Sequence, residues 1–454
     1  MALVSNVIGN NIYLYGRLYD EYDTNNVQLF KIDPISTKIS NGKIIADLNS
    51  GDSGLFIEYG TNIKLFGLNS WGGEGQNVKL SKCYNVNIFA GVNLLNTPNV
   101  VVATQYGIVI SNCQKVLFTG GLFGATRHSI AIGGNSGLCN IVNRDIKISH
   151  ATLLRNGRYD AYAGDMHGNV EDVHYDNCVL DAVGFSGKNV SVKNSTIYGV
   201  RTPHEIAETP ATKSGYATYC NSMLGGYYLL DNCDLIVEGD GSSHGFIYFH
   251  ISHNPKEDVN IIINDVRIHS RTSKPVETLI RLAITVGVET TKKFNIFVDG
   301  LKTFGIPSVN SIIWAGSTTS SHEFVTECDR IQIDNISVPT QNPVTLFRSF
   351  RFSTENTKFK LPSLDGRLKI SAETAAQRKE ASVILPFIYP KVPNVLLSCS
   401  PVGNQTWDET FGNVDPYVHR KAASSLRLGI KTNDLSLPLN KLFDIDYTVS
   451  MSDF

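Results

Sequence analysis

A short pattern of apolar residues recurs along the chain with a polar pair inside it. Two alternate apolar residues precede a pair that is often Asp-Asn, Ser-Asn or Lys-Asn, and two more alternate apolar residues follow it. Clear copies run Ile108–Cys113, Val173–Leu180, Val190–Ile197, Tyr228–Leu235 and Ile331–Val338. Looser copies begin at Ile63, Val78, Val116, Ile146, Ile261 and Ile296. A unit repeated this often, without a helical period, predicts a β-solenoid.

Each half of the pattern is typical of a strand with one buried face, because alternate side chains point to opposite faces of a strand. The polar pair predicts a bend, since Asn, Asp and Gly tolerate left-handed backbone conformations at low cost. We expect the cysteines that follow the bend in the same phase to stack in one interior column. These are Cys83, Cys113, Cys178 and Cys233. The predicted fold is therefore all-β, a parallel β-helix.

The intervals between copies vary although the pattern itself does not. The copies that begin at Val173, Val190 and Tyr228 are separated by 17 and then 38 residues. Strands in constant register with variable intervals predict regular walls joined by loops of different length. Loops on a rigid scaffold commonly carry function.

Composition excludes several classes of function. The 454 residues carry a net charge of -2, which gives no electrostatic reason to expect nucleic acid or an anionic membrane as a partner. No apolar run of membrane-spanning length is present, and the N-terminus lacks a basic start, so we expect neither membrane insertion nor a secretory segment. The eight cysteines form no CxxC pair and no zinc-like spacing. They are expected to be buried free thiols, and no metal or cofactor is predicted.

The pattern divides the chain into four parts. Residues 1–60 are expected to form an N-terminal cap, because the open first turn of a solenoid must be covered. Residues 61–350 carry the repeats and are expected to form the β-helix with its catalytic groove. Residues 351–380 are polar and turn-rich and are expected to be a connector. Residues 381–454 contain short alternating strands with Pro and Gly between them, which predict a small β-sandwich.

The richest cluster of candidate catalytic groups lies between Arg155 and Tyr219, over three consecutive turns of the predicted solenoid. Its acidic members are Asp160, Asp165, Asp181, Glu205 and Glu208. Adjacent turns lie about 4.8 Å apart, so carboxylates on neighbouring turns fall within the roughly 5–9.5 Å separations that glycoside hydrolysis requires. Asp165 and Glu205 are the leading pair, with Asp181 or Glu208 as the substitute. His167 would share the strand face of Asp165 and tune its protonation.

The same cluster supplies candidate substrate-binding groups. Arginines could hold acidic sugars by paired hydrogen bonds, and tyrosines could stack on sugar rings. The candidates are Arg155, Arg158, Arg201, His204, Tyr159, Tyr162, Tyr216 and Tyr219.

The repeats, the long loops in the middle of the chain and the C-terminal segments "LPFIYPKVPNVLLS", "LGIKT" and "FDIDYTVS" together resemble bacteriophage tailspikes. The resemblance implies a right-handed parallel β-helix homotrimer that cleaves capsule or O-antigen polysaccharide. It also implies a C-terminal module that trimerises the spike or binds sugar, and attachment to phage tail or baseplate proteins. Such a protein is made in the bacterial cytoplasm, resides in the virion tail and acts extracellularly at the host cell surface.

Three interpretations of function follow. The favoured one is an endo-acting glycoside hydrolase with paired carboxylates. A polysaccharide lyase would instead remove a proton from a uronic acid, with His167, His204 or Tyr159 as base and Arg201 as cation. A non-catalytic receptor-binding fibre would use the same groove only to hold sugar. A structural adhesin or a pectin-active bacterial enzyme would share the solenoid but more often carries a secretory signal. No G-x-S-x-G elbow supports an esterase.

Overall fold

The structure is a computed structural model. It describes residues 3–9, 11–15, 36–45, 53–71, 75–95, 105–125, 127–133, 142–155, 162–167, 169–199, 217–220, 222–240, 245–251, 254–271, 274–284, 292–317, 328–350, 356–372, 378–401, 414–432 and 441–452. All the regular secondary structure in these ranges consists of β-strands. The chain divides into two compact units: residues 1–212 and 217–236 form the first, while residues 213–216 and 237–454 form the second.

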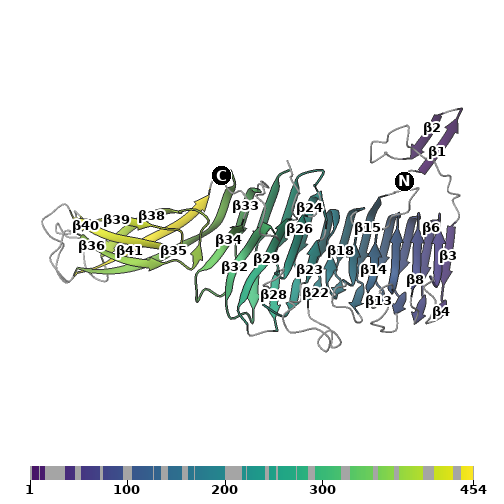
Figure 1. Cartoon of the computed structure of the whole chain (residues 1–454), viewed down its shortest axis with the longest axis horizontal. Coiled ribbons are helices and arrows are strands. Elements are labelled where there is room, and N and C mark those ends of the chain that lie inside the picture. Colours follow the sequence, from purple (N-terminus) through teal and green to yellow (C-terminus); the bar gives the residue numbers. More distant parts are fainter. Residues whose placement is uncertain are drawn as a thin grey trace. The chain divides into compact units, whose positions relative to one another are not determined.

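The first unit is a parallel β-helix in which each coil contributes one strand to each of three walls (Figure 1). Wall 1 contains β3 (Ser36–Ser40), β6 (Thr61–Phe66), β9 (Tyr84–Phe89), β12 (Gln114–Thr119), β15 (Asn143–Ser149), β18 (Val170–Asp176), β21 (Gly187–Lys193) and β24 (Met223–Asp231). Wall 2 contains β4 (Lys43–Ile45), β7 (Asn69–Trp71), β10 (Asn93–Leu95), β13 (Leu122–Ala125), β16 (Thr152–Arg155), β19 (Val179–Leu180) and β22 (Thr196–Gly199). Wall 3 contains β5 (Leu55–Glu58), β8 (Gln76–Ser81), β11 (Tyr106–Ser111), β14 (His128–Ile132), β17 (Gly164–Met166), β20 (Val183–Gly184) and β23 (Thr218–Cys220). A separate antiparallel hairpin joins β1 (Leu3–Ile8) to β2 (Asn11–Tyr15).

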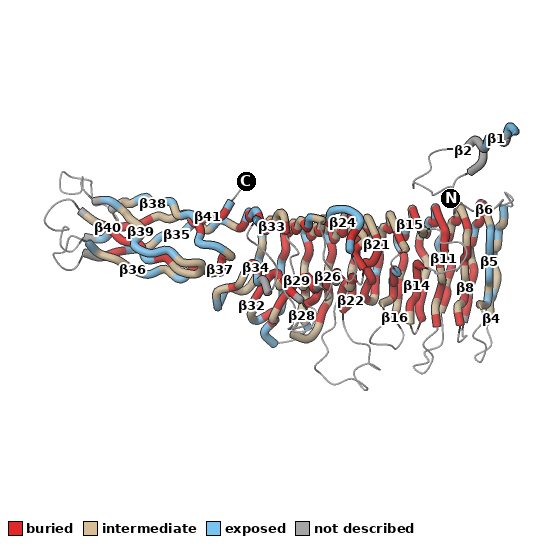
Figure 2. Tube along the Cα trace, turned by 45° about the horizontal axis from the view of Figure 1, so that its top comes forward, coloured by how far each residue is buried: buried red, intermediate tan, exposed pale blue. Residues whose placement is uncertain are grey.

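The apolar positions of the repeat fill the interior of this helix. Val116, Ile146 and Val173 stand in register on successive coils of wall 1, and all three are buried. Figure 2 shows that buried segments alternate along the coils with more exposed ones. Full burial of one such side chain contributes about 1.5–3 kcal/mol. The period-two pattern therefore accounts for both the strands and the core.

Four bends that precede a cysteine use residues in the left-handed region. Lys82 and Asn112 lie between wall 3 and wall 1, whereas Asn177 and Asn232 each follow a strand of wall 1 and lead toward wall 2. The values of φ are 54° at Lys82, 55° at Asn112, 55° at Asn177 and 50° at Asn232. The next residue at each bend is Cys83, Cys113, Cys178 or Cys233, and all four cysteines are buried. The Sγ atom of Cys113 accepts a hydrogen bond from the backbone N–H of Cys83 at 3.4 Å, so these two cysteines stack at the corner between walls 3 and 1. Cys178 and Cys233 lie at the other corner, after strands of wall 1, so the expectation of a single column is wrong. The same short pattern occurs at two different corners of the coil, and the pattern alone does not distinguish them.

The second unit repeats the coil pattern. One sheet contains β27 (Val259–Asn264), β30 (Phe294–Asp299) and β33 (Cys328–Asp334), and another pairs β28 (Arg267–Ser270) with β31 (Lys302–Phe304). The third contains β26 (Ile247–Ile251), β29 (Val276–Ile284), β32 (Val309–Ser317), β34 (Val344–Phe350) and β37 (Phe387–Ile388). Strand β25 (Asp234–Val237) lies where the two units divide the chain.

The second unit ends in the predicted small β-sandwich. Its antiparallel sheets are β35 (Lys358–Ala372), β41 (Lys441–Ser452) and β38 (Asn394–Pro401), and β36 (Arg378–Ile384), β40 (Ser425–Thr432) and β39 (Val414–Lys421). Phe443 and Ile445 of β41 and Leu428 and Ile430 of β40 are fully buried. The all-β prediction, a parallel β-helix followed by a sandwich, is confirmed.

Strand β35 lies within residues 351–380, which we expected to form a connector. It pairs in parallel with β33 and, over most of its length, antiparallel with β41. Pro362 and Gly366 made this segment resemble a turn in the sequence. The strand accommodates the proline at a shift in register between Leu361 and Leu364, because a bulge removes the need for a ladder hydrogen bond at that point. At the other end of the chain, β3 and β4 are already paired with β6 and β7.

Candidate functional site

Asp165 lies on the outer face of wall 3. The residues on either side of it in β17 face the interior: Met166 is buried, and a Cβ atom added to Gly164 would lie 2.8 Å from the hydroxyl of buried Tyr175. Alternation along the strand therefore turns Asp165 outward. Its neighbour in register on β14 is the small residue Ala131. On the next coil a Cβ at Gly184 would lie 3.0 Å from Asp165 Oδ1, so only glycine leaves the carboxylate this room.

Two histidines flank the Asp165 carboxylate. His167 Nε2 lies 2.9 Å from Asp165 Oδ2, and His128 Nε2 lies 3.4 Å from the same oxygen. His128 comes from the start of β14, one coil earlier, and Asp165 itself is only 6% exposed. The carboxylate is thus held between imidazoles from two successive coils.

The protonation of His128 follows from its partners. Its Nδ1 lies 2.8 Å from the carbonyl oxygen of Tyr162, which can only accept, so Nδ1 carries a proton. Burial lowers the pKa of His128, and the nearby Asp165 charge only partly offsets this effect. When His128 is protonated, its Nε2 pairs with the Asp165 carboxylate; when it is neutral, its Nε2 carries no proton. This nitrogen can accept a proton from a hydroxyl group or water molecule placed against it.

Asp165 and His167 have pKa values shifted in opposite directions. Burial alone would raise the pKa of Asp165, but the positive charge that His128 carries when it is protonated and the hydrogen bond from His167 outweigh it and hold the pKa below its usual range. The hydrogen bond to Asp165 raises the pKa of His167. Asp165 is therefore ionised at neutral pH. The His167 side chain is 56% exposed, so it can meet a ligand while it remains bonded to the carboxylate.

Aromatic rings and one arginine surround this trio. Tyr162 stacks on Tyr219 of β23 with ring centroids 5.1 Å apart, and the His128 ring lies 6.4 Å from Tyr162. Tyr106 of β11 lies 5.5 Å from the His128 ring, and Arg127 donates a hydrogen bond to the Tyr106 hydroxyl at 2.8 Å. Flat aromatic surfaces beside a charged centre suit the binding of sugar rings.

A second carboxylate, Asp181, lies on the following coil. Its backbone carbonyl accepts a hydrogen bond from Ala163, two residues before Asp165, and its Oδ2 accepts one from the backbone N–H of Arg155 at 2.9 Å. Burial raises the pKa of Asp181, and contact with Arg155 offsets this only in part. The two carboxylates on neighbouring coils therefore have pKa values displaced in opposite directions, as in pairs that divide acid and base roles.

The structure brings together Asp165, His167 and Tyr162 and places Asp181 beside Arg155. The other predicted site residues lie outside the described residues, and their roles stay predictions: Asp160, Glu205, Glu208, Arg158, Arg201, His204, Tyr159 and Tyr216.

Sequence reasoning missed three members of the site, namely His128, Arg127 and Tyr106. His128 begins the strand in which Ile130 and Ile132 flank Ala131, the register partner of Asp165. Alignment of Ile130 and Ile132 with the coil that carries Asp165 would have revealed His128 as its neighbour.

Within the described part of the chain, no group of three or more His, Cys, Asp or Glu residues is arranged to hold a metal ion. Nor does that part contain any helix of the length and apolar character that crossing a membrane demands.

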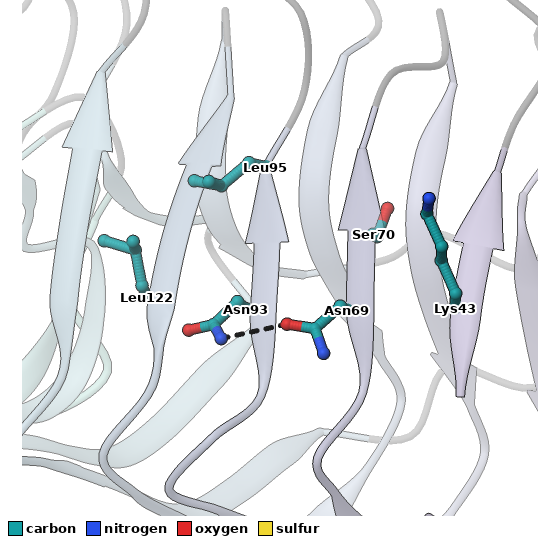
Figure 3. A pocket seen from close by; sticks show the side chains of 6 residues that line it. All are labelled: Lys43, Asn69, Ser70, Asn93, Leu95 and Leu122. Carbon is teal, nitrogen blue, oxygen red and sulfur yellow. Dashed lines mark hydrogen bonds between the residues drawn. The ribbon is translucent and has the colours of Figure 1, made fainter. Parts of the chain in front are cut away.

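A shallow pocket elsewhere in the first unit lies on wall 2 (Figure 3). Lys43, Asn69, Asn93 and Leu122 are among the residues that line it, and Asn93 donates a hydrogen bond to Asn69 at 3.0 Å. None of its lining residues is acidic. It therefore lacks the groups for acid–base cleavage of a glycosidic bond, and the site around Asp165 remains the better candidate.

Comparison with known proteins identifies the class. Residues 72–342 match the model of the Gp49, pectin lyase-like family, and the chain belongs to this family. A search of curated proteins finds no match.

Solved tailspike structures share the fold. The gp61 tailspike of Pseudomonas phage phi297 is 21% identical, with a TM-score of 0.86 over 99% of this chain and 72% of that one. The Gp54 tailspike of Acinetobacter baumannii phage AP22, solved with A. baumannii capsular saccharide, is 24% identical, with a TM-score of 0.86 over 100% and 75%. The gp49 tailspike of Pseudomonas phage LKA1 is 20% identical, with a TM-score of 0.76 over 99% and 73%. The expected likeness to phage tailspikes is thus confirmed for the fold.

Proposed function

We propose that the protein is a phage tailspike depolymerase that cleaves glycosidic bonds of a bacterial capsule or O-antigen. The observation that carries this proposal is the buried, ionised Asp165 held between His128 and His167 on the outer face of a β-helix wall. Membership of the Gp49, pectin lyase-like family and the capsular saccharide bound by the AP22 tailspike support a polysaccharide as substrate.

The proposed chemistry is hydrolysis with divided roles for two carboxylates. Asp165, whose pKa is low, acts as the base that activates water or as the nucleophile. Asp181, whose pKa is raised by burial, acts as the acid that protonates the leaving oxygen. Glu205 and Glu208 remain candidates for the second role. His167 positions Asp165 and stabilises its charge, while Tyr162 and Tyr219 bind sugar rings.

The proposal extends to assembly and location. As in the class of tailspikes, the protein would be a homotrimer attached to the phage tail or baseplate, and it would act extracellularly at the host surface. Sedimentation of the purified chain tests the trimer.

The test of the reaction is incubation with purified capsule and O-antigen from a bacterial panel, followed by assays of reducing ends and of ultraviolet absorbance. Asp165→Asn and Asp181→Asn are compared with Asp145→Asn, a matched control. Asp145 lies on wall 1, its side chain is 44% exposed, and it has a φ of 56° that asparagine also tolerates. Hydrolysis predicts new reducing ends without new absorbance, with loss of cleavage in the first two variants only.

The other outcomes would each contradict part of the proposal. New absorbance from an unsaturated uronate would replace hydrolysis by β-elimination, with neutral His128 as the base and Arg127 as the cation. Binding without cleavage on every glycan would make the protein a receptor-binding fibre.

A further inference from the structure

Four residues from successive coils of the second unit form a row on the outer face of one sheet. Tyr248 of β26 stands in register with Arg281 of β29, Arg281 with Trp314 of β32, and Trp314 with Arg348 of β34. Figure 1 shows these strands in the middle of the picture. We call this row of four residues the Trp314 ladder. Because successive coils lie about 4.8 Å apart, the ladder is about 14 Å long.

The side chains of the ladder point away from the core. Their neighbours along the strands, Ile280 and Leu282 beside Arg281 and Ile313 and Ala315 beside Trp314, are all buried. Alternation along a strand turns the ladder positions outward. Arg281 and Trp314 are partly exposed, and the Arg348 side chain is 54% exposed, so a ligand can reach them. Tyr248 is buried and only extends the row.

Arg281 and Trp314 form a cation–π pair. The guanidinium carbon of Arg281 lies 3.5 Å from the centroid of the Trp314 ring. Burial lowers the pKa of Arg281, although an arginine remains protonated at neutral pH. The stacked ring fixes the plane of the guanidinium group and therefore presents its N–H donors in a set direction.

Arg348 of the ladder has an acidic partner. Arg348 pairs with Glu277 Oε1 at 2.8 Å, and Asn310 donates a hydrogen bond to Glu277 Oε2 at 2.6 Å. Glu277 thus lies between one guanidinium group and one amide from the two following coils. An oriented arginine beside aromatic rings suits a ligand that combines a negative group with an apolar face.

We propose that the Trp314 ladder is a binding subsite for an acidic sugar of the polysaccharide. The carboxylate of a uronic or related acid binds the guanidinium group of Arg281, and the apolar face of a sugar ring lies against Trp314. This subsite holds the polymer and takes no part in bond cleavage. The inference rests on the proposed function in one respect, that the ligand is a polysaccharide.

The experiment measures binding by affinity electrophoresis of the full chain. The probes are polygalacturonate, hyaluronan and each capsule of the panel, every one paired with its carboxyl-reduced form. Trp314→Ala and Arg281→Gln are compared with Phe304→Ala and Arg330→Gln. Phe304 is 46% exposed on β31, and Arg330 lies on β33, so both controls alter other walls of the same unit. Arg281→Lys retains the charge without the guanidinium fork.

The proposal predicts that at least one carboxylated glycan binds and that reduction of its carboxyl groups weakens binding tenfold or more. Trp314→Ala and Arg281→Gln should weaken it to a similar extent, Arg281→Lys should restore little, and the two controls should bind as the parent does. A melting temperature equal to that of the parent shows that each variant is folded. Equal binding of acidic and reduced glycans, absence of binding to every carboxylated probe, or unchanged binding by folded Trp314→Ala would overturn the proposal.

Asp165→Asn separates this proposal from the proposed function. If that variant binds but does not cleave, while Trp314→Ala cleaves short fragments but holds the polymer weakly, both proposals stand. If Asp165→Asn still cleaves while Trp314→Ala loses binding, the catalytic assignment fails and the subsite stands.

Discussion

The Nε2 atom of His167 lies 2.9 Å from Oδ2 of Asp165, a residue two positions earlier that is itself almost fully buried. This contact lowers the pKa of the Asp165 carboxylate, which burial would raise, and it raises the pKa of the His167 imidazole. An ionised carboxylate is thereby retained on an outer wall of the β-helix. The chemistry proposed for the site depends on this pair.

The pair predicts a dependence of stability on pH. Because the folded pKa of His167 is raised above its ordinary value of 6.5, its contribution to stability is full below that pH and is lost as pH rises through the folded pKa. The folded pKa of Asp165 lies below its ordinary value of 3.8, so its contribution is present above that pH and is lost as pH falls through the folded pKa. The joint contribution should be greatest between about pH 4 and 6.5.

Guanidinium unfolding of the parent and of His167→Gln across this range checks the prediction. The difference between their midpoints should shrink as pH rises above the ordinary pKa of His167. A difference that stays constant from acid to alkaline pH would contradict the assigned pKa shifts.

Replacement of Gly184 by alanine should disturb the site without disturbing the core. The added Cβ would lie 3.0 Å from Asp165 Oδ1 and 3.3 Å from the backbone nitrogen of Met166, so the carboxylate must move. A displacement of this kind lowers turnover by about 10- to 100-fold. The control is Gly42→Ala, whose Cβ would meet only the flexible side chain of Leu68 at 3.2 Å. Equal turnover of the two variants would argue against a catalytic Asp165.

Two neighbouring residues of β12 test the inward and outward alternation of the coil. Phe118 is fully buried and packs edge-to-face on Phe123 at 5.6 Å, whereas Leu117 is 36% exposed. Phe118→Ala should lower the free energy of unfolding by about 3–5 kcal/mol through loss of burial and formation of a cavity. Leu117→Ala should change it by about 0.5 kcal/mol or less. Chemical unfolding measures both, and similar losses would contradict the register.

The bend at Asn177 has a conformational requirement that can be measured in the same way. Its φ is 55°, a region that costs a β-branched residue about 1–2 kcal/mol or more. Asn177→Val should be destabilising by that amount, and Asn177→Gly should be nearly neutral. Comparable destabilisation by both would mean that the asparagine side chain, rather than the backbone conformation, is what the bend requires.

The sequence predicted the solenoid because the determinants of its coils are local. Alternation fixes the buried face of a strand such as β18, and a residue such as Asn177 fixes the bend that follows. The two-residue spacing of Asp165 in β17 and His167 just after it likewise placed both on one face. These features need no knowledge of distant contacts.

The rest of the site depends on how coils align, which the sequence does not display. His128 meets Asp165 only because β14 and β17 are neighbours, and the interval between coils varies with every loop. The long strand β35 was hidden for a different reason, since Pro362 and Gly366 are turn residues in isolation and the neighbouring β41 overrides that preference. Glu205 lies outside the described residues, so its role stays a prediction.

The most direct test of the account compares the parent chain with Asp165→Asn on one polysaccharide that the parent cleaves. The account predicts that the variant still binds the polymer but releases reducing ends at least 1,000-fold more slowly, which is about 4 kcal/mol of transition-state stabilisation. Asp145→Asn should cleave at the parental rate. Cleavage by Asp165→Asn within tenfold of the parent would contradict the assignment of this site.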